Sequence, residues 1–251
     1  MKTNRRRRIW RGVMLAIGGV LMLLAVGEVY RRTAENRPTE FRPDPEVYTV
    51  KGIDVSAHQG EVDFERVAAD GVDFVILKAT EGTDFKDSRF IDNYREARRA
   101  GLKVGAYHFF RFDTDGRMQA INLLHSVRNR RLDFPVIIDV EEWGNPDAID
   151  TAEIIGRLRS LLRHLQINGI EAMIYTNKDG YERFIRDNFA EFPLWIATMT
   201  DPEPELGWAL WQYSHKGTVD GVEGKVDLNT VNPQSPLLRD VRADRSGAAK
   251  P

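Results

Sequence analysis

The stretch Phe134-Pro-Val-Ile-Ile-Asp139-Val-Glu141-Glu-Trp143 decides the fold of this chain, because an apolar run passes directly into carboxylates and an aromatic residue. Such a continuous apolar run is typical of a strand buried on both faces, as in a parallel sheet covered by helices. Side chains alternate along a strand, so Asp139 and Glu141 are predicted to project to one face, with Cα atoms about 6.6 Å apart. Val140 and Glu142 are predicted to point the other way.

Two carboxylates on one face at the end of a buried strand are costly if they serve structure alone. A carboxylate that leaves water needs a cation, hydrogen-bond donors or a shifted pKa. Asp139 and Glu141 are therefore candidates for chemistry. The alternative is that one is a capping carboxylate and the other a solvated loop acid.

Short apolar runs alternate with segments of helical periodicity over residues 48–235, and this alternation predicts an α/β domain. About eight strands and roughly five helices are expected, with few helices in the final third. A chain of 251 residues suits a single β/α barrel. The expected strands are 48–55, 74–79, 104–110, 136–138, 172–176, 194–198, 209–213 and 226–231, and the expected helices include 62–69, 88–100, 118–129 and 151–165.

The composition limits the chemistry and the partners of the chain. Cysteine is absent, which excludes disulfides, thiolate catalysis and cysteine-ligated metals. Residues 1–45 hold ten Lys or Arg against four acids, which leaves 26 basic and 34 acidic residues in 46–251. An acidic globular part has no electrostatic footprint for nucleic acid. No G-x-G-x-x-G or P-loop motif follows an expected strand, which disfavours a nucleotide-binding enzyme.

The N-terminus predicts export. Arg5 to Arg8 precede an apolar stretch, 12–27, whose length lies between the core of a signal peptide and a full membrane span. Residues 1–30 are expected to be a signal peptide or a signal anchor, and an uncleaved anchor is the preferred interpretation. The basic flank predicts that the domain lies outside the cytoplasm, attached to the cell membrane. The expected location is the periplasm, or the medium if the signal is cleaved.

Polar segments flank the predicted domain on both sides. Residues 31–47 contain Pro38, Pro43 and Pro45 without an apolar period, which is typical of a semi-extended tether. Such a short tether would keep the domain near its membrane. Residues 236–251 turn polar and are expected to form a C-terminal tail.

Acids, amides and aromatic residues recur where the expected strands end. In a parallel barrel the catalytic and ligand-binding side chains lie at the rim formed by the carboxyl ends of the strands. Aromatic faces with carboxylates and amides between them suit a sugar, whose rings have apolar C–H faces and hydroxyl-bearing edges. The residues singled out in these positions are Asp54, Gln59, Tyr107, Asp139, Glu141, Trp143, Tyr175, Trp195, Trp211 and Asp227.

Several short motifs follow one another in order from about residue 50 to residue 232. They are Gly52-Ile-Asp54-Val-Ser56 with Gln59-Gly60, Lys78-Ala-Thr80-Glu81-Gly82, Gly105-Ala-Tyr107-His108-Phe109, Asp139-Val-Glu141, Ile174-Tyr175-Thr176, Leu194-Trp195-Ile-Ala197, Trp211-Gln212-Tyr213 and Val226-Asp227-Leu-Asn229. This ordered series resembles the family 25 glycoside hydrolases, which are lysozymes acting as N-acetylmuramidases. The resemblance implies an irregular, single-domain β/α (TIM-like) barrel with fewer helices than strands. It also implies cleavage of the β-1,4 bond between N-acetylmuramic acid and N-acetylglucosamine in peptidoglycan.

The resemblance implies a role for each acid. Glu141 matches the general acid/base, which must hold a proton near neutral pH to protonate the leaving oxygen. Asp139 is expected to raise the pKa of Glu141 by repulsion and to orient the substrate's 2-acetamido group if that group attacks the anomeric carbon. Direct attack by water is the other route. Asp54 and Asp227 match two further acids of the cleft, although turn or strand-cap carboxylates are the alternative.

The other matched residues are candidates for binding substrate. The expected set is Tyr107, Tyr175, Trp195, Trp211, Gln59 and Trp143, and any one of the aromatic residues could instead serve packing alone. Lys78 and Glu81 are expected either to contact substrate or to form a buried ion pair. His58 and His108 lack an H-x-x-x-H partner and a matching third ligand, so no metal and no cofactor are predicted.

Two further functions are compatible with the sequence. A membrane-tethered module of this fold could bind peptidoglycan without cutting it, although the intact Asp139 and Glu141 argue against a retired site. A hydrolase of a related aminosugar polymer such as chitin is the third hypothesis. The expected partners are glycan strands and, through the N-terminal apolar segment, the membrane; the chain is expected to be a monomer.

Overall fold

A computed structural model of the chain describes residues 42–242. The predicted signal segment 1–30 lies outside these residues. The strands are β1 (Lys51–Val55), β2 (Phe74–Glu81), β3 (Phe85–Lys86), β4 (Lys103–Phe109), β5 (Val136–Asp139), β6 (Ala172–Asn177), β7 (Leu194–Ala197), β8 (Trp208–Gly217) and β9 (Val226–Val231). The α-helices are α2 (Phe64–Ala69), α3 (Phe90–Arg99), α4 (Gly116–Val127), α5 (Thr151–Ile167), α6 (Lys178–Gly180) and α7 (Leu237–Arg242).

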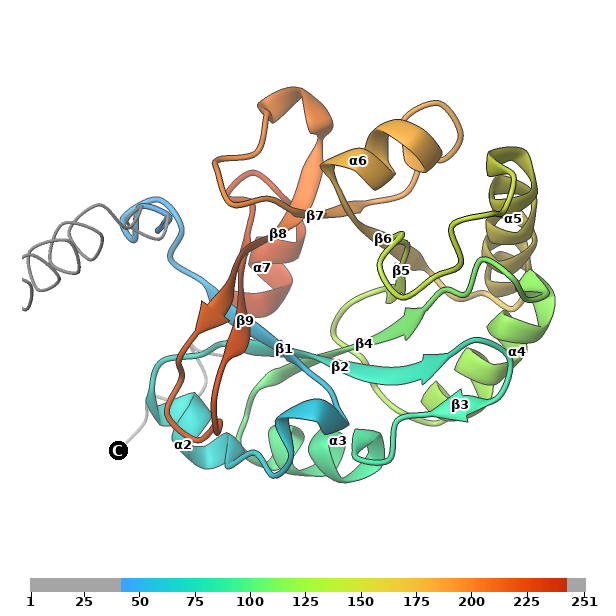
Figure 1. Ribbon diagram of the computed structural model, residues 1–251. Coiled ribbons are helices and arrows are strands. Elements are labelled where there is room, and N and C mark those ends of the chain that lie inside the picture. Colours follow the sequence, from blue (N-terminus) through green and yellow to red (C-terminus); the bar gives the residue numbers. More distant parts are fainter. Residues whose placement is uncertain (1–41, 243–251) are drawn as a thin grey trace, which may run out of the picture. The chain divides into compact units, whose positions relative to one another are not determined.

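The strands close into a barrel (Figure 1). The order is β1-β9-β8-β7-β6-β5-β4-β2, and β1 pairs back onto β2 to complete the ring, while β3 adds to the edge of β2. Strand β9 runs antiparallel to both of its neighbours, and the other barrel strands run parallel to one another. The predicted irregular β/α barrel is confirmed. Its irregularity includes the antiparallel hairpin of β8 and β9.

Helices cover one part of the barrel more than the other. Helices α3, α4 and α5 pack against β2, β4 and β6, and Figure 1 shows them beside the blue-green to yellow strands. The helix predicted for residues 151–165 is present as α5, and its Ile154, Leu158 and Leu161 are almost inaccessible. Between β7 and β9 the described chain has only a single 3₁₀ turn, Pro204–Leu206, which confirms the helix-poor final third.

Two glycines allow large side chains to fill the barrel. A Cβ atom at Gly52 would lie 2.1 Å from Cζ of Phe74, and one at Gly105 would lie 2.4 Å from Cδ1 of Ile76. Phe74 and Ile76 are fully buried in the same apolar cluster. The interior below the rim is therefore a packed core, as in other barrels of this type. Packing therefore explains why the motif that begins at Gly52 and the motif that begins at Gly105 each start with a glycine.

The domain continues beyond residue 235, where the sequence pattern predicted its end. Helix α7 occupies the start of the expected polar tail, and Val241 is buried in the same cluster as Phe74. Leu237 and Leu238 pack against that cluster. The spacing of Leu237, Leu238 and Val241 puts them on one helical face, a short amphipathic signal that the polar residues around it obscure.

Candidate active site

A cleft of about 460 Å³ opens at the rim where the parallel strands end. It brings together every site residue predicted from the sequence except Trp211. Its lining consists of Asp54, Ser56, His58, Gln59, Lys78, Glu81, Tyr107, Phe109, Arg111, Asp139, Glu141, Trp143, Gly144, Tyr175, Trp195, Gln212 and Asp227.

Strand β5 delivers two carboxylates to this cleft. Asp139 is its last residue and Glu141 follows two residues later, so both side chains face the cleft as predicted. Val140 is fully buried on the opposite face, where helices cover the strand. Glu142 also points away from the cleft and forms an ion pair with Arg183. The alternation expected for a strand end therefore separates a catalytic candidate from an ordinary surface acid.

The paired carboxyl groups are held in an environment that favours the protonated form. Asp139 is only 7% exposed, and its Oδ1 atom has no hydrogen-bond partner among the described residues. Burial, followed by repulsion from Glu141, raises the pKa of Asp139 well above its ordinary value. Burial is also the main cause that raises the pKa of Glu141. The expected repulsion between the two carboxylates contributes to the raised pKa of Asp139.

Two further acids meet across the junction between β1 and β9. Asp54 lies near the end of β1 and is paired in register with Asp227, near the start of β9. Because β9 runs antiparallel, its first residues reach the same rim that the other strands reach with their last residues. Burial and the charge of Asp227 raise the pKa of Asp54 to about 7.

A buried amide network fixes Asp54. Its Oδ2 atom accepts hydrogen bonds from Gln212 Nε2 at 2.9 Å and from Asn229 Nδ2 at 2.8 Å. Tyr175 donates its hydroxyl to Gln212 Oε1 at 2.8 Å, and Trp195 donates Nε1–H to Asn229 Oδ1 at 3.1 Å. Tyr175 and Trp195 thus line the cleft while orienting the two amides that hold Asp54.

The loop after β5 is clamped to the end of β4. Asn145 donates Nδ2–H to the carbonyl oxygens of Glu141 and Phe110, each at 3.0 Å, and accepts the Phe112 N–H at 2.8 Å. This clamp fixes the backbone of Glu141. The same loop carries Trp143, which is 79% exposed and borders the cleft. Trp143 therefore has an aromatic face available to a ligand.

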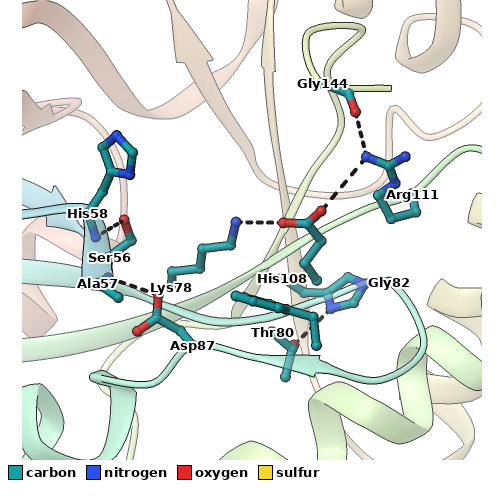
Figure 2. A network of polar contacts seen from close by, with 12 residues as sticks. Ser56, Ala57, His58, Lys78, Thr80, Gly82, Asp87, His108, Arg111 and Gly144 are labelled. Atoms are coloured by element: carbon teal, nitrogen blue, oxygen red, sulfur yellow. Dashed lines mark hydrogen bonds and ion pairs between the residues drawn. The ribbon is translucent and has the colours of Figure 1, made fainter. Parts of the chain in front are cut away.

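A chain of charged side chains crosses the cleft beside β2 and β4 (Figure 2). Lys78 Nζ donates to Glu81 at 2.8 Å, and Arg111 lies 3.7 Å from the same carboxylate and donates to the carbonyl oxygen of Gly144. Lys78 also lies over the Phe109 ring, at 5.2 Å from its centroid. Of the two alternatives for Lys78 and Glu81, the ion pair is present, although it is part-buried and both residues also line the cleft.

Gln59 and Tyr107 line the cleft from two different elements, a turn and a strand. Gln59 follows β1, and its Oε1 atom accepts the Ser56 N–H at 2.9 Å, which closes a capping box around the turn Ala57–Gln59. Tyr107 is part of β4, and burial followed by the charge of Asp139 raises its pKa well above the ordinary value. Tyr107 therefore keeps its hydroxyl proton and can donate a hydrogen bond into the cleft.

Trp211 does not reach the cleft. Its side chain is fully buried, and Nε1 donates to the Thr198 carbonyl oxygen at 2.8 Å. The ring packs against Tyr48 and Trp208 in a separate aromatic cluster. Trp211 therefore contributes to stability, and its neighbour Gln212 is the residue of this motif that faces the ligand space.

Sequence reasoning missed His215, whose Nδ1 atom lies 3.2 Å from Oδ1 of Asp227. It also gave no role to Gln212 and Asn229, although both stand in quoted motifs. The register of a strand hairpin cannot be read from residue spacing when bulges interrupt it, so the contact of His215 was hidden. Within residues 42–242, no three His, Asp or Glu side chains are placed to hold a metal ion. No helix in that range has both the length and the hydrophobicity to cross a bilayer.

Comparison with known proteins agrees with this geometry. The model of glycosyl hydrolases family 25 matches residues 53–222. Lysozyme M1 of Streptomyces globisporus is 34% identical, covering 75% of this chain and 70% of its own length. The autolytic lysozyme of Clostridium acetobutylicum is 35% identical, covering 72% of this chain and 55% of its own length.

Solved structures share the barrel. A family 25 glycosyl hydrolase from Bacillus anthracis superposes with a TM-score of 0.71 at 29% identity, over 78% of this chain and 94% of that one. The bacterial lysozyme of Streptomyces coelicolor gives 0.67 at 31% identity, over 79% and 98%. The extent of the family match, the identity to curated relatives and the acid-lined cleft lead to one conclusion. This chain is a glycoside hydrolase and belongs to family 25.

Proposed function

We propose that this protein hydrolyses the β-1,4 bond between N-acetylmuramic acid and N-acetylglucosamine in peptidoglycan. The observation that carries the proposal is the pair of the buried Asp139 and the half-buried Glu141, which line a sugar-sized cleft and have raised pKa values. A retired binding site gains nothing from such a pair, which is costly to bury. Relatives named as lysozymes and as N,O-diacetylmuramidases support this substrate class.

Glu141 is the proposed general acid/base. Its raised pKa keeps a proton available for the glycosidic oxygen, so that the bond to the anomeric carbon breaks and the N-acetylglucosamine end leaves as an alcohol. Glu141, then ionised, takes a proton from the incoming water. That water supplies the new hydroxyl at the anomeric carbon. The product therefore ends in a reducing N-acetylmuramic acid.

Asp139 is the proposed partner of the substrate's 2-acetamido group. Its Oδ1 atom is buried and has no hydrogen-bond partner in the described chain, so an acetamido N–H would satisfy it. That contact would aim the acetamido oxygen at the anomeric carbon. The unsatisfied oxygen therefore favours the substrate-assisted route over direct attack by water. Asp54 and Asp227 are proposed to contact or tune the same region from the opposite wall.

Aromatic and amide side chains are proposed to bind the glycan. Trp143 has the exposed face needed to stack on a sugar ring, whereas Trp195 is 2% exposed and forms part of the cleft floor. Tyr107 and Gln59 offer polar groups from the cleft lining. Stacking and hydrogen bonding together are the usual basis of carbohydrate recognition.

The test is product analysis with the full chain. Purified peptidoglycan and chitin are incubated with the protein, and new reducing ends are counted and identified. Reducing N-acetylmuramic acid from peptidoglycan alone is the expected result. Release of fragments from chitin at a comparable rate would refute the muramidase assignment in favour of a broader aminosugar hydrolase. If the protein is pulled down with the glycan and no new reducing end forms, the protein would be a binding module and not an enzyme.

We further propose that the enzyme acts outside the cytoplasm, held at its membrane by residues 1–30 and linked by the tether 31–47. The basic cluster and apolar stretch at the N-terminus support this proposal. Cell fractionation tests it. Recovery of the full-length chain in washed membranes is expected, a shorter chain in the medium would show cleavage, and a cytoplasmic chain would refute export.

A further inference from the structure

His215 is a titratable side chain that contacts Asp227, an acid of the cleft lining, and that the proposed mechanism does not use. It lies on β8, where the pairing with β9 shifts register between Gln212 and Ser214 and again between Ser214 and Gly217. Bulges of this kind re-aim side chains beside active sites. Here His215 is turned toward Asp227, with Nδ1 3.2 Å from Oδ1, while half of the imidazole remains exposed.

The charges around His215 are mainly negative. Asp227 on β9 is its direct partner, Asp54 faces it from β1, and Glu141 faces it from the loop after β5. Lys78 on β2 is the other cation that acts on Glu141, but its Nζ atom is already bound to Glu81 at 2.8 Å. His215 is therefore the basic side chain that pairs with one of the cleft acids, Asp227, whereas Lys78 pairs with Glu81.

We propose that His215 is a positioning residue of this glycosidase: its Nδ1–H fixes the Asp227 carboxylate at the rim, and its positive charge offsets the acids around Glu141. The inference rests on the proposed function, because it concerns how that reaction is tuned. Asp227 and Glu141 remain the groups that face the substrate. His215 acts through them.

The electrostatic part of the role has a definite sign. Hydrogen bonding to Asp227 raises the pKa of His215, which favours the cationic imidazolium. The cation lowers the pKa of Glu141, opposing the effect of burial. Without this cation, Glu141 would keep its proton to higher pH, and the alkaline limb of the pH–rate profile would move upward.

Two substitutions separate the charge from the hydrogen bond. In His215→Asn the side-chain amide can still donate to Asp227 but carries no charge, whereas His215→Ala removes both. The readout is kcat/KM against pH for release of reducing ends from peptidoglycan. His125→Gln on α4 is the matched control, because His125 is exposed and contributes nothing to the cleft lining. Thermal unfolding confirms that each variant is folded.

We expect the alkaline limb of His215→Asn to lie at higher pH than that of the wild type. His215→Ala should show the same displacement and also lose about tenfold in kcat/KM, the cost of one charge-assisted hydrogen bond. A His215→Asn profile that superimposes on the wild type would refute the electrostatic role. Wild-type kcat/KM in His215→Ala would refute the positioning role. An inactive wild type would instead refute the proposed function, so the two failures are distinguishable.

Discussion

Carboxylates in this protein fall into two groups that differ in whether a cation accompanies them. Glu142 and Glu81 are each bound by a cation, Arg183 in the first case and Lys78 with Arg111 in the second. Asp139 and Glu141 face the cleft and form no ion pair with a cation within residues 42–242, and their pKa values are raised. The adjacent residues Glu141 and Glu142 thus belong to different groups because of strand alternation alone.

This difference separates acids that stabilise the surface from acids that can donate a proton. An ion-paired carboxylate stays ionised and is a poor proton donor near neutral pH. A buried carboxyl group without a cation retains its proton and can deliver it. Burying several such groups lowers the stability of the folded state. The amide network around Asp54 and the clamp on the Glu141 backbone hold the groups in place.

The largest expected effect comes from replacing Glu141 by glutamine, compared with the same replacement of its neighbour Glu142. Glu141→Gln keeps the shape but cannot supply a proton, so turnover of peptidoglycan should fall by at least about a hundredfold. Glu142→Gln is the matched control, and its turnover should stay within about threefold of the wild type because it loses only a surface ion pair. Similar losses in both variants would abolish the distinction between the two groups.

The pH dependence of stability gives the next effect. The pKa of Asp54 is about 7 in the folded protein against an ordinary 3.8, so the folded state binds this proton more tightly than the unfolded state. Between about pH 4 and pH 7 the unfolded chain ionises first, and the wild type should therefore lose up to roughly 4 kcal/mol of stability through Asp54 as the pH rises. Asp139 acts in the same direction.

Asp54→Asn, which cannot ionise, should flatten this decline. The measurement is thermal unfolding of the full chain in mild detergent, followed by circular dichroism at several pH values. Asp63→Asn is a suitable control for the substitution itself, because Asp63 is an exposed helix N-cap remote from the cleft lining. Parallel stability curves for the wild type and Asp54→Asn would show that Asp54 is ionised throughout.

Trp143 and Trp211, which were both predicted from the sequence to bind substrate, provide a test with a smaller expected effect. Trp143→Ala should raise KM for peptidoglycan about tenfold with little change in stability, because an exposed stacking face is lost. Trp211→Phe should instead lower the free energy of unfolding by about 2 kcal/mol, through a lost hydrogen bond and a smaller buried ring. Its KM should be unchanged. An unaltered KM in Trp143→Ala would remove Trp143 from the glycan-binding surface.

Local sequence rules predicted the strands and the acids that lie near their ends. The common orientation of Asp139 and Glu141 follows directly from alternation after an apolar run, and the ion pair of Lys78 with Glu81 was one of two alternatives for that motif. The small number of helices in the final third was also predicted, since few segments there have apolar residues at helical spacing. These features depend on residues close together in the chain.

Long-range geometry explains what the sequence left hidden. Trp211 and Gln212 are neighbours, yet only Gln212 faces the cleft, and the face each residue takes depends on a barrel register that spacing does not reveal. The antiparallel direction of β9 brings Asp227 to the rim from the start of its strand. The bulged pairing of β8 with β9 brings His215 to that acid. Each of these contacts depends on pairing between distant segments.

The most direct test of the central claim is mass spectrometry of fragments released from purified peptidoglycan in heavy-oxygen water. The wild type and Glu142→Gln should release fragments that end in reducing N-acetylmuramic acid carrying one heavy oxygen at the anomeric carbon, and Glu141→Gln should release essentially none. Labelled fragments from Glu141→Gln at the wild-type rate would contradict the assignment of Glu141 as the proton donor and, with it, the functional difference between the two groups of carboxylates.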